Sequence, residues 1–145
     1  MNKKEVEILL VEDNQDDEEL AKIALKNNNI TNKMQVVRDG VEALEYLFGS
    51  VDSEMLKCVN PTVVLLDLKL PKIDGLEVLR RIKTNPVSKK IPVVVMTSSS
   101  EEKDLVESYR PGVNSYIRKP VDFNQFREVV RQIGLYWLSL NKQPS

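Results

Sequence analysis

Two short segments of the chain are apolar at every position, and this feature limits the fold more than any other. Val63 to Leu66 and Ile91 to Met96 carry no polar side chain. A strand with one face in water alternates apolar and polar residues, whereas a strand covered on both faces is apolar throughout. These segments therefore predict the buried parallel strands of an α/β protein, with helices on both faces of the sheet.

Helical periodicity separates the predicted strands. Strands are expected at 6–11, 34–38, 63–66, 91–96 and 113–117, and helices begin near 16 or 17, 41, 76 and 122. Leu20, Ile23, Ala24 and Asn27 recur at helical spacing in the first of these helices, and Ser99 with Glu102 fits a capping box. Five strand–helix units predict a flavodoxin-like, doubly wound parallel sheet, for which the fold class implies the strand order 2-1-3-4-5.

The composition indicates one ordinary globular domain over residues 1–145. Basic and acidic side chains number 21 and 22, for a net charge of −1. The sequence lacks a basic stripe of the kind that would indicate nucleic-acid binding. No apolar run is long enough to cross a membrane. With Cys58 as the single cysteine, a reducing cytoplasm is expected. The lack of histidine excludes Ser-His-Asp triads and His-rich zinc sites.

Reactive side chains follow the predicted strands. Glu12 and Asp13 follow the first strand, Asp67 the third, Thr97 the fourth and Lys119 the fifth. In doubly wound sheets, ligands bind outside the carboxyl ends of the strands, where the strand order reverses. We therefore expect these five side chains to converge on one edge of the sheet.

The acidic residues suggest a bound cation. Clustered carboxylates repel one another, and their oxygen atoms favour a hard ion such as Mg2+. A lysine opposite the ion adds a second positive charge, and both charges can stabilise a phosphoryl group in transfer. An aspartate carboxylate can itself act as the nucleophile.

Five motifs, in order, resemble the bacterial response-regulator receiver family. They are Val11-Glu12-Asp13-Asn14, Leu66-Asp67-Leu68-Lys69-Leu70-Pro71, Asp74-Gly75, Met96-Thr97-Ser98 and Tyr116-Ile117-Arg118-Lys119-Pro120, and the resemblance covers residues 6 to about 135. It implies a two-component response regulator that takes a phosphoryl group from a sensor histidine kinase and switches conformation. No separate output domain and no catalytic turnover of its own are expected.

The resemblance also assigns roles to residues. It implies that Asp67 is phosphorylated, and that Glu12, Asp13, Asp67 and the backbone carbonyl of Lys69 bind Mg2+. Thr97 and Lys119 would hold the phosphoryl oxygens, and Tyr116 would be the switch aromatic. The Lys119-Pro120 peptide bond would be cis.

A narrower resemblance connects the chain with the small regulators of bacterial phytochrome kinases. It rests on Asn14-x-x-Asp17, a long loop at 50–60 and the ending Tyr136-Trp137-Leu138-x-x-Asn141. Where that subgroup commonly has Asn two residues after the phosphoacceptor, this chain has Lys69, a change that bears on the lifetime of the phosphoryl group.

The last helix, expected from about 122 to 140, predicts self-association. Its apolar positions have the spacing of a heptad seam: Phe123, Phe126, Val130, Ile133, Trp137 and Leu140. Together with Tyr116 on the neighbouring strand, they form the predicted homodimer surface. The alternative is that the first half of the helix packs on the sheet and the remainder frays.

Three other functions are compatible with the predicted fold. An aspartate-nucleophile phosphatase usually needs a second carboxylate at the position that Lys69 occupies. A flavin carrier needs a phosphate-binding loop where Glu12 and Asp13 would repel the phosphate. A pseudo-receiver that acts only through protein contacts is the main alternative.

Overall fold

The protein is built around a parallel sheet of five strands, shown in a computed structural model that describes residues 8–28, 33–49, 61, 63–98, 115–129 and 131. The strands are β1 (Ile8–Val11), β2 (Met34–Val37), β3 (Val63–Asp67), β4 (Val93–Thr97) and β5 (Ser115–Arg118). Every neighbouring pair is parallel, and the order is β2-β1-β3-β4-β5. The predicted flavodoxin-like sheet and its order are confirmed.

The register brings the carboxyl ends of the strands to one edge. Val11 at the end of β1 is aligned with Val37 and Leu66. Asp67 is aligned with Met96, and Thr97 with Arg118. Residues that follow β1, β3, β4 and β5 therefore begin at nearly the same height of the sheet.

Each of the helices α1 (Gln15–Asn27), α2 (Gly40–Phe48) and α3 (Gly75–Thr84) begins after a side chain that caps it. Asn14, Asp39 and Asp74 accept hydrogen bonds from backbone N–H groups three residues further on. The predicted start of α1 at Asp16 or Asp17 was slightly late, because Asn14 is the capping residue.

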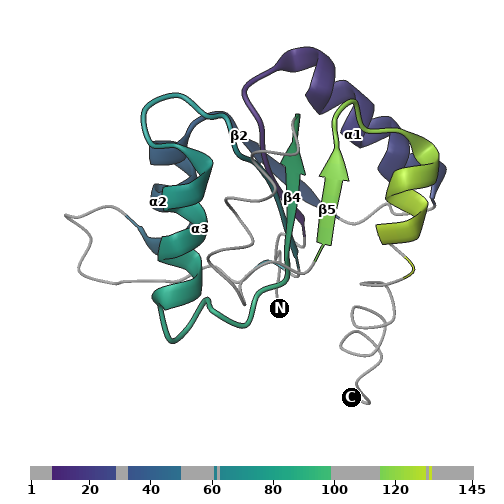
Figure 1. The fold of residues 1–145 in the computed structure, drawn as a ribbon. Coiled ribbons are helices and arrows are strands. Elements are labelled where there is room, and N and C mark those ends of the chain that lie inside the picture. Colours follow the sequence, from purple (N-terminus) through teal and green to yellow (C-terminus); the bar gives the residue numbers. More distant parts are fainter. Residues whose placement is uncertain are drawn as a thin grey trace.

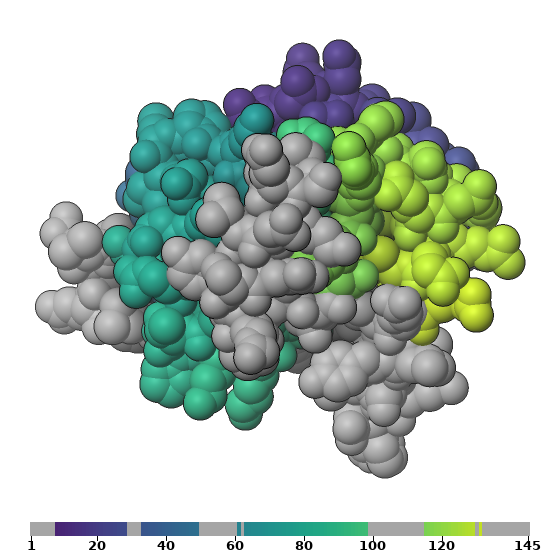
Figure 2. Space-filling view, viewed as in Figure 1, coloured from purple at the N-terminus to yellow at the C-terminus, as the bar shows by residue number. Residues whose placement is uncertain are grey.

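The helices cover the sheet in two layers (Figure 1). α2 and α3 lie on one face, whereas α1 and the helical segment 123–129 lie on the other. In the space-filling view, the teal surface around α3 and the yellow-green surface of residues 115–129 lie on opposite sides of the molecule (Figure 2).

Alternate residues of the strands pack against the two layers, so the central strands β1, β3 and β4 are buried on both sides. Leu9, Val64 and Val95 pack in the cluster under α2 and α3, whereas Leu10, Leu65 and Met96 pack in the cluster under α1 and 123–129. This arrangement explains why β3 and β4 are apolar at every position before the last.

Two apolar residues lie differently from the sequence expectation. Ile23 is 49% exposed, because the buried side of α1 is formed by Ala21, Ala24 and Leu25. Phe126 is 2% exposed and packs in the core under the sheet. Its assignment to a dimer surface was therefore wrong, since its side chain faces the interior of its own domain.

Several predictions fall outside the described residues. These are the capping box at Ser99 and Glu102, the loop at 50–60, and the dimer residues Val130, Ile133 and Trp137. The extended helix is described only to 129 and at 131. Among the residues that the structure does describe, no helix is both long and apolar enough to cross a bilayer.

Gly75 lets α3 begin directly behind the end of β3. A Cβ atom at this position would lie 2.4 Å from the carbonyl oxygen of Asp67 and 2.6 Å from the Cα atom of Leu68. The Gly75 N–H also donates to the Leu68 carbonyl at 2.9 Å. This close approach fixes the backbone that carries Asp67.

Candidate functional site

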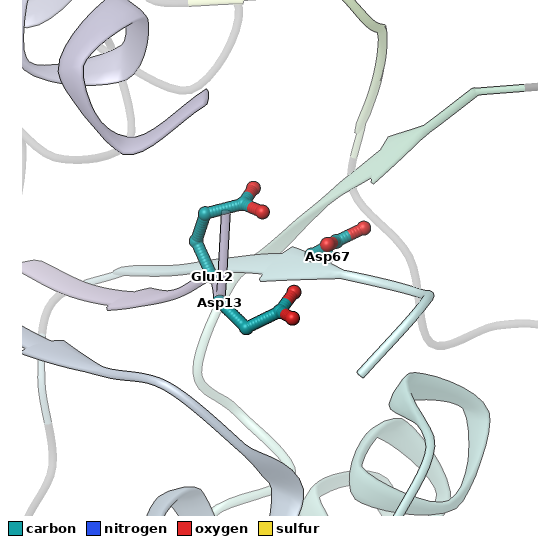
Figure 3. Close-up of side chains that lie close together, drawn as sticks. All are labelled: Glu12, Asp13 and Asp67. Atoms are coloured by element: carbon teal, nitrogen blue, oxygen red, sulfur yellow. The ribbon is translucent and has the colours of Figure 1, made fainter. Parts of the chain in front are cut away.

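Three carboxylates converge at the edge of the sheet where the strands end. Glu12 and Asp13 follow β1 and Asp67 ends β3, and one oxygen of each lies within 4.8 Å of the others. Figure 3 shows the three side chains turned toward a common space. Glu12 and Asp67 are buried, whereas Asp13 is exposed, so Asp13 is the member of the cluster that faces solvent.

Lys119 joins the cluster from the residue directly after β5. Its Nζ atom lies 3.1 Å from Asp67 Oδ2 and donates a hydrogen bond of 3.2 Å to Glu12 Oε2. The Lys119 backbone N–H donates to the Thr97 carbonyl at 2.8 Å, which ties the lysine to the end of β4. The cis Lys119-Pro120 bond is present as predicted.

A fourth carboxylate, which was not predicted as part of the site, also contacts Lys119. Asp17 Oδ2 accepts a hydrogen bond of 2.9 Å from the ammonium. The sequence contained a usable signal, because the first turn of a helix that directly follows β1 must lie at the same edge of the sheet. Asp17 enters the sequence-based prediction only as a possible helix start and as part of the Asn14-x-x-Asp17 motif.

The pKa of Glu12 is shifted by its buried position. Burial and the neighbouring Asp67 charge raise the pKa of this carboxyl to about 8, although Lys119 opposes the shift. Burial by itself would lower the pKa of Lys119, but the hydrogen bond to Asp17 and the charges of Asp67 and Glu12 raise it above its ordinary value. The site therefore holds one firmly charged ammonium and an excess of carboxylates.

The donor set fits a hard divalent cation. Within the part of the chain that the structure describes, Glu12 Oε1 is a buried oxygen that accepts no hydrogen bond, although the Lys119 ammonium lies 3.1 Å away. A buried carboxylate oxygen without a hydrogen bond is costly, and a cation among three carboxylates relieves both that cost and their repulsion.

The remaining predicted residues lie near this cluster. Thr97 is 3% exposed at the end of β4, and the Lys69 N–H donates to Asp67 Oδ1 at 3.2 Å. Tyr116 on β5 is partly buried and packs against the cluster beneath α2 and α3. The structure thus places Lys69 in contact with Asp67, Thr97 at the end of the strand next to β3, and Tyr116 on β5, one strand further away.

A cavity of about 530 Å³ opens beside Asp13 and gives access to the cluster from solvent. It is lined by Asp13, Leu68, Lys69, Leu70, Pro71, Asp74 and Leu76. The loop after β3 forms most of this wall, so the cavity beside Asp13 is largely apolar and has charged groups at its margin.

Residues 8–131 match the model of the response regulator receiver domain. The chain belongs to this family. Receiver domains act in two-component and phosphorelay signalling, so the acidic cluster lies in a signalling domain that receives phosphoryl groups.

Proteins similar to this receiver domain include regulators associated with phytochromes. Response regulator Rcp1 of Synechocystis sp. is 40% identical over 138 residues, which cover 95% of this chain and 92% of Rcp1. The bacteriophytochrome response regulator RtBRR is 47% identical, with a TM-score of 0.80 over 90% of this chain and 79% of that one.

Two further solved structures show such regulators phosphorylated or with a metal bound. The phosphorylated cyanobacterial phytochrome response regulator RcpA is 42% identical, with a TM-score of 0.72 over 98% of this chain and 100% of that one. The Mn2+-bound form of Rcp1 is 41% identical, with a TM-score of 0.71 over 93% and 95% of the two chains. The predicted family and its phytochrome-associated subgroup are confirmed.

Proposed function

We propose that this receiver domain accepts a phosphoryl group on Asp67 from a phosphohistidine of a sensor kinase. The observation that carries the proposal is the position of Asp67. It is the carboxylate at the end of a buried central strand, 3.1 Å from the Lys119 ammonium and grouped with Glu12 and Asp13. The role is that of a phosphoacceptor that assists its own phosphorylation, not of an enzyme with turnover.

The transfer requires only one bond to form and one to break. A carboxylate oxygen of Asp67 attacks the phosphorus atom, the phosphorus–nitrogen bond breaks, and the departing imidazole nitrogen keeps the electron pair. The product is an aspartyl phosphate on Asp67. Since the phosphoryl oxygens carry the charge, Lys119 and the hydroxyl of Thr97 stabilise them by an ion pair and a hydrogen bond.

Glu12, Asp13, Asp67 and the backbone carbonyl of Lys69 would hold Mg2+, the hard cation that this oxygen set favours. When bound, the cation supplies positive charge that neutralises the carboxylates and the phosphoryl oxygens. The acidic group and the Mn2+ in the Rcp1 structure support a divalent cation here. The choice of Mg2+ rests on the preference of carboxylate and phosphate oxygens for a small hard ion.

The proposed phosphodonor is a phytochrome histidine kinase. The support is that two similar proteins, RtBRR and RcpA, are a bacteriophytochrome response regulator and a cyanobacterial phytochrome response regulator. We place this exchange in the cytoplasm, with Thr97 and Tyr116 as the residues that change position after phosphorylation. The regulatory unit is proposed to be the single domain 1–145, with its last helix extending to about 140.

We propose a homodimer through β5 and the last helix, with a surface that no longer includes Phe126. Phe123 is 40% exposed and Tyr116 is partly buried, so both can contribute to such a surface, whereas Phe126 cannot. Trp137→Ala should weaken the dimer about thirtyfold, since removal of an aromatic anchor typically costs about 2 kcal/mol. Sedimentation of wild type, Trp137→Ala and the control Ile23→Ala measures this, and a monomeric wild type at high micromolar concentration contradicts it.

The decisive test of the function is labelling by a phosphorylated phytochrome kinase and by a small phosphodonor. Wild type should become labelled in Mg2+, and Asp67→Asn should not, because its side chain amide is a poor nucleophile. Asp16→Asn removes the same charge from an exposed position and should label like wild type. Full labelling of Asp67→Asn would refute the assignment, and an unlabelled wild type would favour a pseudo-receiver.

A further inference from the structure

The carboxylates around Lys119 differ in what else they can do. An ammonium has three N–H donors, and here the carboxylates of Glu12, Asp17 and Asp67 surround it. Glu12 and Asp67 also belong to the acidic cluster that suits a cation, whereas Asp17 does not. Among the described side chains that contact the Lys119 ammonium, Asp17 is therefore the one with no part in that cluster.

The start of α1 leaves the Asp17 carboxylate available for this contact. Asp17 is the third residue of α1, where an acidic side chain often bonds back to the N–H of the capping residue. In this chain the Asn14 N–H donates to Glu12 Oε2 at 3.2 Å instead. The Asp17 backbone is itself fixed, because its N–H donates to Asn14 Oδ1 at 2.9 Å. Its carboxylate reaches across to Lys119 from a fixed backbone.

We propose that Asp17 is a positioning residue that holds the Lys119 ammonium over Asp67 while Glu12 is engaged by a bound cation. This inference rests on the proposed function, since it concerns the same phosphoryl site. Lysine has a flexible four-carbon stem, so an ammonium without a fixed partner samples many positions. The Asp17 contact is the shortest of those around Lys119, at 2.9 Å, and it comes from a different element than the cation cluster.

Two substitutions separate the hydrogen bond of Asp17 from its charge. Asp17→Asn and Asp17→Ala both remove the charge, but only asparagine keeps an oxygen that can accept from Lys119. Asp16→Asn and Asp16→Ala are the matched control pair, because Asp16 is exposed in the same turn of α1. The control pair also measures the effect of the difference in helix propensity between asparagine and alanine, which both pairs share.

The first measurement is calorimetric binding of beryllofluoride, a phosphoryl mimic, to the full chain in Mg2+. Asp17→Ala should bind about five- to tenfold more weakly than Asp17→Asn, because the freed lysine must be ordered when the mimic binds. The Asp16 pair should differ by about twofold or less, as surface substitutions usually do. If the Asp17 pair differs no more than the Asp16 pair, the proposal fails.

The second measurement observes Lys119 directly and does not depend on phosphorylation. Hydrogen-bonded lysine ammonium groups exchange protons slowly enough to give NMR signals, and Lys119→Met assigns the signal. In Mg2+, it should persist in wild type and Asp17→Asn and vanish in Asp17→Ala. A signal that persists in Asp17→Ala would overturn the proposal. If wild type fails to bind beryllofluoride, the proposed function fails, and this signal alone decides the role of Asp17.

Discussion

Gly75→Ala tests whether close packing behind β3 fixes the phosphoacceptor. The added Cβ atom would lie 2.4 Å from the Asp67 carbonyl oxygen and 2.6 Å from the Leu68 Cα atom. Both are backbone atoms of the segment that carries Asp67, so no flexible side chain can move aside. The start of α3 must separate from the end of β3, and such overpacking costs about 1–3 kcal/mol.

The gain in helix propensity from the same substitution opposes this cost but is smaller. Alanine is a better helix former than glycine by about 1 kcal/mol inside a helix, and Gly75 is only the first residue of α3. Gly75 is also absent from the glycines with positive φ, so backbone strain plays no part. We therefore expect a net loss of about 2 kcal/mol, which corresponds to roughly 4–8 °C in melting temperature for a chain of this size.

Urea unfolding and labelling by a small phosphodonor measure the two consequences. Gly75→Ala should unfold at lower urea concentration and label more slowly, because the displaced carbonyl belongs to Asp67 itself. Gln15→Ala is the control, since Gln15 is the exposed first residue of α1. If Gly75→Ala matches wild type in both assays, the close approach does not fix the site and the reasoning is refuted.

Three further predictions concern Glu12 and the cation. The folded-state pKa of Glu12 is raised from 4.5 to about 8, so its contribution to stability is complete below pH 4.5 and is lost as the pH rises through 8. Urea unfolding in chelator should show this loss, at most about 1.4 kcal/mol per pH unit, and Glu12→Gln should flatten it; an equal slope in both proteins would contradict the shift. In calorimetric titration with Mg2+, Asp13→Ala should weaken metal binding more than Glu12→Ala does, by analogy with the direct and water-mediated ligands of the family. The reverse order of affinities would exchange the roles of the two acids. Excess chelator should stop phosphoryl labelling of wild type, and unchanged labelling would exclude a required cation.

The sequence alone determined the fold class and most of the site. Continuously apolar strands indicate burial on both faces, and their alternation with helical segments predicts a parallel sheet between two layers of helices. The carboxyl ends of parallel strands meet at one edge, so Glu12, Asp13, Asp67 and Lys119 could be placed together from their positions after the strands. The motifs around them also identified the family, because five were present in the family's order.

Tertiary structure decided which neighbours these residues have. The hydrogen bond between Asp17 and Lys119 joins residues that are 102 positions apart, and the Asn14 N–H donates to Glu12 and not to Asp17. The position of Asp17 in the first turn after β1 predicts the edge of the sheet at which it lies, but not which side chain it contacts there. The burial of Phe126 and the exposure of Ile23 were likewise set by how each helix is rotated on the sheet. Periodicity gives a helix an apolar side, but packing against the sheet determines which residues that side contains.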